Sequence, residues 1–143
     1  MYEKLYGDFL ISIDTLRVYE DEKLVFSSQK ERLLPLLEYI EGYSVNKRQV
    51  VIFDKIMGNA AALLSIKAGV KEVYSPLGSQ IAVNTLDKYR IRYHLSEIVP
   101  FIQQPNSEDM CPMERLSVGK DPEEFYTALL DTIKRQGGND GEN

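Results

Sequence analysis

The stretch that constrains the fold most is residues 49–75, where two short apolar runs flank a segment rich in alanine and leucine. The first run, residues 50–53, has the length and the β-branched content of a buried strand. Asp54 ends this run, Gly69 closes the helical segment, and residues 70–74 begin a second strand. A strand–helix–strand unit of this kind makes a right-handed crossover between parallel strands. The stretch therefore predicts an α/β fold with a buried parallel sheet.

The segments before this unit predict an antiparallel hairpin and a helix. Residues 15–19 and 23–27 alternate between apolar and polar side chains around a charged turn, as two half-buried strands do. The regular helix of segment 29–41 is expected to begin just before Pro35, because proline fits a helix only in its first turn.

The remaining elements continue the same alternation of helices and strands. We expect a helix at 2–11, a turn at 76–79, a helix from Ser79 to Tyr89, a strand at 91–95, a polar loop at 103–109, a helix start at 111–114 and a last helix from Asp121. This order predicts one three-layer α-β-α domain over residues 1–136, with a mixed sheet of about five strands. The polar, glycine-rich residues 137–143 are expected to form a disordered tail.

Charge and cysteine content narrow the classes of function. The chain has 17 Lys and Arg against 22 Asp and Glu, and so lacks the basic excess that a nucleic-acid partner requires. No apolar run reaches the roughly 20 residues of a membrane span, and no export signal is visible. Its single cysteine, Cys111, favours a cytoplasmic location. One His and one Cys cannot build a Cys-rich or three-His zinc site, so no zinc is expected.

Three short motifs resemble the signatures of a known family. They are residues 54–62, 69–74 and 109–114, which read Asp-Lys-Ile-Met-Gly-Asn-Ala-Ala-Ala, Gly-Val-Lys-Glu-Val-Tyr and Asp-Met-Cys-Pro-Met-Glu. From about residue 16 to residue 134 the chain resembles an uncharacterised prokaryotic family that carries a domain-of-unknown-function label. The resemblance implies a cytidine-deaminase-like fold and no particular activity. Because members of that fold commonly self-associate through helices that cover the sheet, it also implies a homo-oligomer.

The zinc ligands of a deaminase are missing from the corresponding places. A zinc-dependent deaminase has a His or Cys, and a Glu two residues on, after the central strand, and Pro-Cys-x-x-Cys before the next helix. This chain has Asp-Lys-Ile at residues 54–56 and Ser-Pro-Leu-Gly-Ser at residues 75–79. Without the metal, no hydroxide forms to attack a base, and we reject zinc-dependent deaminase activity.

A candidate ligand site lies at the end of the central strand. Asp54 and Lys55 follow this strand, and ligands of open α/β sheets bind outside the carboxyl ends of the strands. Gly58 and Asn59 open the next helix, whose free backbone amides favour an anion such as a phosphate. The alternative is that Asp54 only caps the helix, Lys55 is solvated, and Gly58 permits tight helix–sheet packing.

A second candidate group follows the polar loop. If Pro112 is the first helical residue, Cys111 is the N-cap and Glu114 occupies the position of a capping-box carboxylate. A helix N-terminus favours a reactive thiolate, whereas a lone cysteine is otherwise a small buried hydrophobe. The single histidine, His94, lies on an expected strand beside Tyr93, where a surface or core position is the ordinary interpretation.

These observations lead to three hypotheses. The first is a protein that binds a small nucleotide-like or phosphorylated ligand, such as an ADP-ribose-type molecule. Its site would contain Asp54, Lys55, Gly58, Asn59, Ser75, Ser79 and Glu114. The second is an enzyme with Cys111 or Asp54 as nucleophile or base, and the third is a non-catalytic oligomeric assembly protein. The sequence names no cofactor.

Overall fold

The computed structural model of the chain describes residues 1–43 and 49–141, with backbone alone for residues 137–141. It contains a five-stranded sheet in the order β2-β1-β3-β4-β5. The strands are β1 (Leu16–Glu20), β2 (Lys23–Ser28), β3 (Val50–Asp54), β4 (Val70–Ser79) and β5 (Arg92–Val99). Strand β1 is antiparallel to both of its neighbours, and β3, β4 and β5 are parallel. The predicted α/β class and the five-stranded mixed sheet are confirmed, whereas the cytidine-deaminase-like label stays a prediction.

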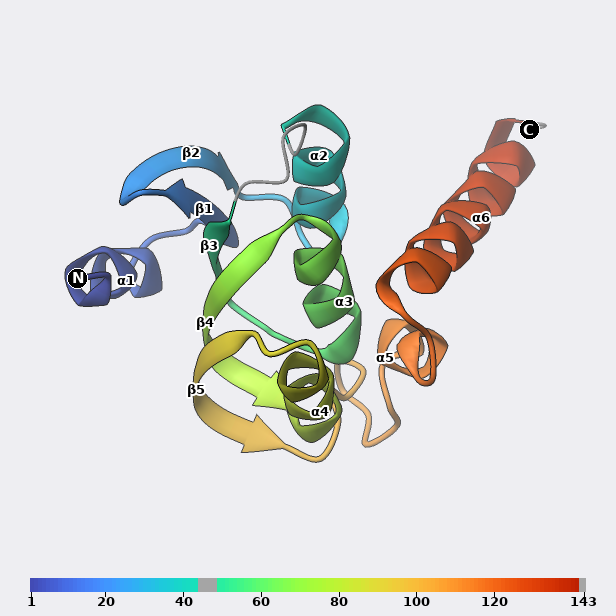
Figure 1. Cartoon of the computed structure of the whole chain (residues 1–143). Helices are drawn as coiled ribbons and strands as arrows, with labels where there is room; N and C mark the ends of the chain where they lie inside the picture. Colours follow the sequence, from blue (N-terminus) through green and yellow to red (C-terminus); the bar gives the residue numbers. More distant parts are fainter. Residues whose placement is uncertain (44–48, 142–143) are drawn as a thin grey trace.

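Helices flank both faces of the sheet (Figure 1). They are α1 (Glu3–Leu10), α2 (Leu34–Gly42), α3 (Asn59–Lys67), α4 (Gln80–Lys88), α5 (Pro112–Ser117) and α6 (Pro122–Gly141). One face is partly covered by α1, and α2, α3 and α4 cover the other. Helices α5 and α6 pack on α3 from the side away from the sheet.

The arrangement of helices around the sheet explains why the sequences of β3 and α3 are almost continuously apolar. All five residues of β3 are buried, because helices cover it on both faces. The first seven residues of α3, Asn59–Ser65, are also buried, since α3 lies between the sheet and the α5–α6 layer. The small alanine side chains at its start let the sheet and the four helices α2, α4, α5 and α6 approach it closely. Residues 49–75 thus form the centre of the molecule, as the sequence predicted.

A smaller aromatic core lies between α1 and the sheet. Tyr2, the N-cap of α1, and Phe9 within α1 pack on three aromatic side chains of the sheet. These side chains are Tyr19 on β1, Phe53 on β3 and Tyr74 on β4. Ring centroids in this group lie 4.8 to 6.3 Å apart, within the range at which aromatic pairs attract one another. The short α1 is thereby held to the sheet by side-chain packing.

Two boundaries differ from the sequence-based expectations. Residues 76–79 were expected to be a turn, but β4 continues through them to Ser79. Its last three residues pair with Glu97–Val99 of an equally extended β5, and the backbone of Met57 bonds to Leu77 and Ser79. Pro76 suggested a turn. Its missing N–H is tolerated in β4 because the pairing with β5 runs from Ser75 to Leu77 without a pair at Pro76.

The C-terminal helix also runs further than expected. Helix α6 reaches Gly141 and so enters the segment 137–143 that was expected to be a disordered tail. Residues 142–143 lie outside the described part of the chain. The division between domain and tail stays a prediction.

Candidate functional site

The buried carboxylate of Glu114 lies at the N-terminus of α3. Glu114 is 2% exposed, and its Oε1 accepts a hydrogen bond of 2.5 Å from the backbone N–H of Asn59. The hydroxyl of Ser79 donates to the same oxygen over 3.3 Å, and the backbone N–H of Ile102 donates to Oε2 over 2.6 Å. The chain's own carboxylate thus occupies the position where the sequence suggested an external anion.

The side chain of Asn59 extends this cluster to two further helices. Its Nδ2 donates to the backbone oxygen and to Oγ of Ser117 over 3.3 and 2.9 Å. Its Oδ1 accepts from the hydroxyl of Thr85 on α4. The hydroxyl of Ser117 in turn donates to the backbone oxygen of Glu114 over 2.6 Å. Hydrogen bonds therefore join the start of α3 to α4 and α5.

At Gly58, α5 and its preceding loop come close to the start of α3. A Cβ atom on Gly58 would lie 2.9 Å from Cγ1 of Ile102 and 3.3 Å from Oε1 of Glu114. The backbone φ of Gly58 is −79°, which any residue adopts. The absence of a side chain at this position therefore makes room for Ile102 and Glu114 of the same chain.

Asp54 lies at the carboxyl end of β3 with little compensation for its burial. Its Oδ1 accepts a long hydrogen bond of 3.4 Å from the N–H of Ile56. Burial raises the pKa of Asp54 to about 7, although hydrogen bonds from the backbone of Ile56 and Lys55 act in the opposite direction. A carboxyl group with such a pKa exists in both protonation states near neutral pH.

Lys55 turns to the α1 side of the sheet. Its ammonium group donates to the backbone oxygen of Ser12 over 2.9 Å and lies 4.7 Å from the ring centroid of Phe9. Ser75 on β4 is buried, and its hydroxyl donates to the backbone oxygen of Leu77 over 3.0 Å. The side chains of Lys55 and Ser75 thus donate to backbone oxygens outside the Glu114 cluster.

Cys111 is the N-cap of α5, as predicted, and its side chain is partly exposed and makes no cap hydrogen bond. The predicted capping box is wrong, because the N–H of Cys111 donates to the backbone oxygen of Ile102 over 2.7 Å. Glu114 is unavailable for the box, since both of its carboxylate oxygens accept from other elements. The N-cap of α4 is confirmed: Oγ of Ser79 accepts from the N–H of Ala82 over 3.0 Å.

Sequence reasoning missed a polar group on the sheet face beside α1. Nε2 of His94 lies 2.5 Å from Oε2 of Glu72, and the His94 ring stacks on the ring of Tyr74 with centroids 4.1 Å apart. Burial, and then the negative charge of Glu72, raises the pKa of Tyr74 to about 12. The parallel register that pairs Tyr74 with His94 brings these residues together. The one sequence signal for this group is the alternation of side chains along β4 and β5, which places Glu72, Tyr74 and His94 on the same face of the sheet.

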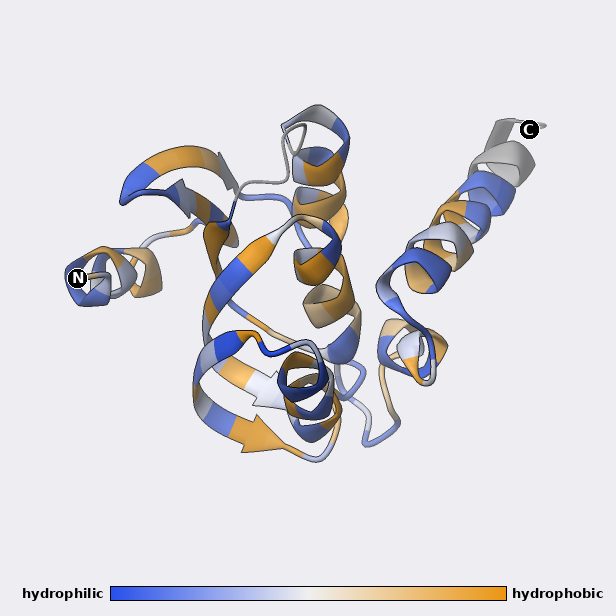
Figure 2. Ribbon diagram, in the orientation of Figure 1, coloured by the Kyte–Doolittle hydropathy of each residue, from blue (hydrophilic) through white to orange (hydrophobic). Residues whose placement is uncertain are grey.

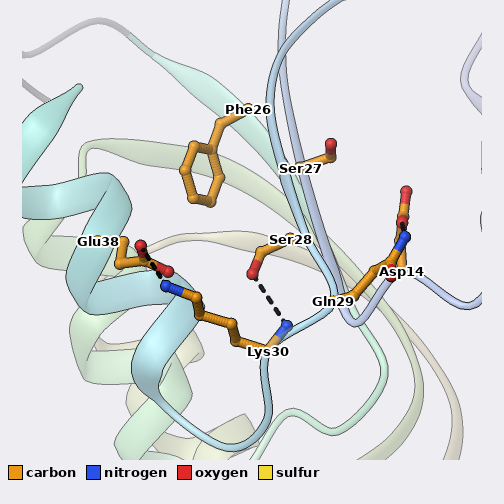
Figure 3. Close-up of a pocket in the computed structure, with 7 residues that line it drawn as sticks. All are labelled: Asp14, Phe26, Ser27, Ser28, Gln29, Lys30 and Glu38. Carbon is orange, nitrogen blue, oxygen red and sulfur yellow. Dashed lines mark hydrogen bonds and ion pairs between the residues drawn. The ribbon is translucent and has the colours of Figure 1, made fainter.

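A groove at the other edge of the sheet was also missed (Figure 3). It has a volume of about 540 Å³ and is lined by residues of β2, the segments around it and α2: Asp14, Phe26, Ser27, Ser28, Gln29, Lys30 and Glu38. Nζ of Lys30 lies 2.8 Å from Oε2 of Glu38, and the N–H of Lys30 donates to Oγ of Ser28 over 3.1 Å. These groups are partly solvated, so the groove is open and polar.

The described residues contain neither a group of side chains suited to a metal ion nor a helix suited to a membrane. Within residues 1–43 and 49–141, no three His, Cys, Asp or Glu side chains are grouped so that they could hold a metal ion. No helix in that part of the chain has the length and apolar content needed to cross a membrane.

Comparisons with known proteins bear on the whole domain. The model of a family described as a domain of unknown function, DUF1893, matches residues 10–133. The solved structure of a DUF1893 family protein from Thermotoga maritima is similar, with a TM-score of 0.82 and 24% sequence identity over 91% of this chain and 88% of that chain. At this identity the likeness shows the fold alone. No curated protein sequence matches the chain.

Proposed function

The chain belongs to the DUF1893 family, and on this premise we propose that it binds a small nucleotide-like or phosphorylated ligand, such as an ADP-ribose-type molecule. The proposed site is the carboxyl edge of the sheet. The observation that supports it most is the set of three donors that converge on Glu114: the N–H of Asn59, the hydroxyl of Ser79 and the N–H of Ile102.

These donors form a cradle for one anionic group. They come from the start of α3, the end of β4 and the loop before α5, and all three donate to the carboxylate of Glu114. A phosphate oxygen carries a similar charge and accepts hydrogen bonds in the same way. In the proposal, Glu114 holds the anion position in the free protein, and the phosphate of the ligand replaces it.

Helix α5 is the element that would move. It carries Glu114, is six residues long and follows the polar loop at 103–109. Its outward movement would open the space beside Gly58, where Ile102 and Glu114 now lie. The binding free energy must therefore exceed the cost of removing Glu114 from its donors, which lowers the apparent affinity of the ligand.

Asp54 supplies the second polar group of the proposed site. With its pKa raised to about 7 by burial, its protonated form can donate a hydrogen bond to a ligand oxygen at neutral pH. Lys55 follows Asp54 directly after the end of β3, and Ser75 follows Tyr74, the β4 residue that pairs with Phe53. In the proposal these two residues contribute through their backbone groups.

The test is a calorimetric titration of the wild-type chain and of Glu114→Ala with inorganic phosphate and with ADP-ribose. Removal of the competing carboxylate should tighten phosphate binding at least tenfold, provided that the unfolding transition shows a folded variant. Glu123→Ala is the matched control, because Glu123 is a 71% exposed carboxylate paired with Lys67. The proposal would be contradicted if neither inorganic phosphate nor ADP-ribose gave a heat of binding with the wild-type chain or with Glu114→Ala.

The enzymatic alternatives stay predictions. Cys111 is partly exposed at the N-cap of α5 and Asp54 is protonated in part near neutral pH, so both remain candidates for a nucleophile or base. We further propose that the protein acts in the cytoplasm, which rests on its single cysteine.

A further inference from the structure

Strand β2 is an edge of the sheet and is weakly protected against pairing with another strand. Edge strands expose unpaired backbone N–H and C=O groups, and proteins usually shield them with charged side chains. The opposite edge strand, β5, carries Arg92, His94 and Glu97. In β2, Leu24 and Val25 are 51% and 39% exposed, and its apolar middle is visible beside the hydrophilic hairpin tip in Figure 2.

We propose that β2 pairs antiparallel with β2 of a second copy of this chain, which joins the two sheets into one continuous sheet. Antiparallel pairing of identical strands has twofold symmetry, and the same residues therefore contribute from both copies. The irregularity of the β1–β2 ladder between Val18 and Tyr19 leaves Phe26–Ser28 as the regular part of β2, and the new pairing is centred there.

The charges at the two ends of β2 select a second copy as the partner. The hairpin tip carries Asp21 and Glu22 followed by Lys23, and the segment that follows β2 carries Lys30, Glu31 and Arg32, all of them exposed. With the pairing centred on Phe26–Ser28, Glu22 of one copy lies opposite Arg32 of the other, and Lys23 lies opposite Glu31. Antiparallel pairing brings the acidic tip of each copy alongside the basic segment of the other. Opposite charges thus meet twice in a symmetric dimer, which favours this orientation over a parallel one.

The groove of Figure 3 lies beside the place where the apolar middle of the second copy's β2 arrives, because in this register Ser28, Gln29 and Lys30 face Phe26, Val25 and Leu24 of the second copy. It is lined by residues that follow or end β2, among them Ser28, Gln29 and Lys30. A six-residue strand buries less area by itself than the roughly 1,600 Å² of a standard interface. Contacts of Leu24 and Val25 of the second copy with the groove add to the buried area, and we therefore expect a reversible dimer whose population depends on concentration.

The experiment measures mass by sedimentation across a hundredfold range of concentration. The wild-type chain should move from 16.4 kDa toward twice that mass, and Leu24→Glu should stay monomeric at every concentration. Ile11→Glu is the matched control, because Ile11 is 87% exposed but follows α1; it should dimerise as the wild type does. Both variants alter exposed positions, and an unfolding curve checks that they are folded.

A charge exchange tests the orientation separately. Glu22→Lys should weaken the dimer at least tenfold, and Glu22→Lys combined with Arg32→Glu should restore it. A wild-type chain that is monomeric throughout, or a dimer that Ile11→Glu abolishes and Leu24→Glu spares, would overturn the proposal. Failure of the double variant to recover would overturn the antiparallel charge pairing.

Discussion

Two buried carboxyl groups near the ends of parallel strands have different hydrogen-bonding surroundings. Glu114 is 2% exposed and accepts hydrogen bonds from three donors, one of them at the N-terminus of α3. These donors satisfy both oxygens of the buried carboxyl group. Asp54 accepts a long hydrogen bond of 3.4 Å from Ile56, and burial raises its pKa to about 7 despite the backbone hydrogen bonds of Ile56 and Lys55. The two carboxyl groups therefore differ in the number of hydrogen bonds they accept, and burial penalises the ionised form of Asp54.

Replacing Glu114 by glutamine should destabilise the fold. The amide nitrogen of Glu114→Gln would face one of the backbone donors, Asn59 or Ile102, and leave it buried without an acceptor. The expected loss in the free energy of unfolding is about 2 to 4 kcal/mol, measured by urea denaturation. The control, Glu123→Gln, breaks only an exposed ion pair with Lys67 and should cost less than about 1 kcal/mol. Equal losses in the two variants would contradict the structural role of Glu114.

Asp54→Asn should change how stability depends on pH. In the unfolded chain this carboxyl group releases its proton near the ordinary value of 3.8, and in the folded chain near about 7. Between these values the folded state holds more protons, so the wild-type free energy of unfolding falls as pH rises, by at most roughly 1.4 kcal/mol per pH unit.

The asparagine variant lacks this contribution. Its stability relative to the wild type should therefore be greater at pH 8 than at pH 4, as urea denaturation at a series of pH values would show. The same pH dependence in both proteins would mean that Asp54 does not titrate in this range.

Part of the candidate site was predictable at this scale. Gly58, Asn59, Ser79 and Glu114 were singled out from the sequence, and the structure brings them together. The role of Glu114 was not predictable, because it accepts from Asn59 across a separation of 55 positions. Local spacing suggested a capping box within α5 instead. No local pattern reveals a contact between helices so far apart in sequence.

At the scale of the element, predictions succeeded where the pattern was local and failed where pairing was tertiary. The β-branched run of β3 and the N-cap at Ser79 were readable from neighbouring residues. The last residues of β4 were not, because they are held by β5 and by Met57. Their sequence, Pro-Leu-Gly-Ser, has the composition of a turn.

Gly58→Ala tests the contact between α3 and the α5 segment. The backbone conformation suits alanine, but the new methyl group would lie 2.9 Å from Cγ1 of Ile102, so Ile102 must shift. We expect a loss of about 1 to 3 kcal/mol, measured by thermal unfolding. Gly7→Ala in α1 meets no atom within 4 Å and should be neutral or stabilising, since alanine favours a helix. If Gly58→Ala is as stable as the wild type, Ile102 can move away from the new methyl group without a measurable loss of stability.

At the scale of the whole molecule, the topology is that of a mixed α/β fold, and the family match covers most of it. The DUF1893 match begins at residue 10, so it leaves out nearly all of α1, which covers the aromatic side of the sheet. The sequence predicted the order of the elements because each has its own periodicity. It did not predict the polar group around His94 or the groove beside β2, which arise only when strands from distant segments become neighbours.

Phe9→Ala tests how α1 is attached. Phe9 is fully buried against Phe53 and the rest of the aromatic core, and its removal should cost about 3 to 5 kcal/mol. Because the packing of α1 depends on this side chain, hydrogen exchange should show faster exchange in α1 than in α3. Equal acceleration in both helices would mean that α1 unfolds only with the whole domain.

The central claim, that a ligand phosphate replaces Glu114 on its donors, is tested most directly by the backbone amide NMR signals of Asn59 and Ile102. Both N–H groups donate to Glu114 in the free protein. Titration of the wild-type chain with ADP-ribose should shift both signals together and saturably, with a smaller effect at Lys67 at the far end of α3. Signals of Asn59 and Ile102 that stay unmoved at millimolar ADP-ribose would contradict the account and leave Glu114 as a purely structural group.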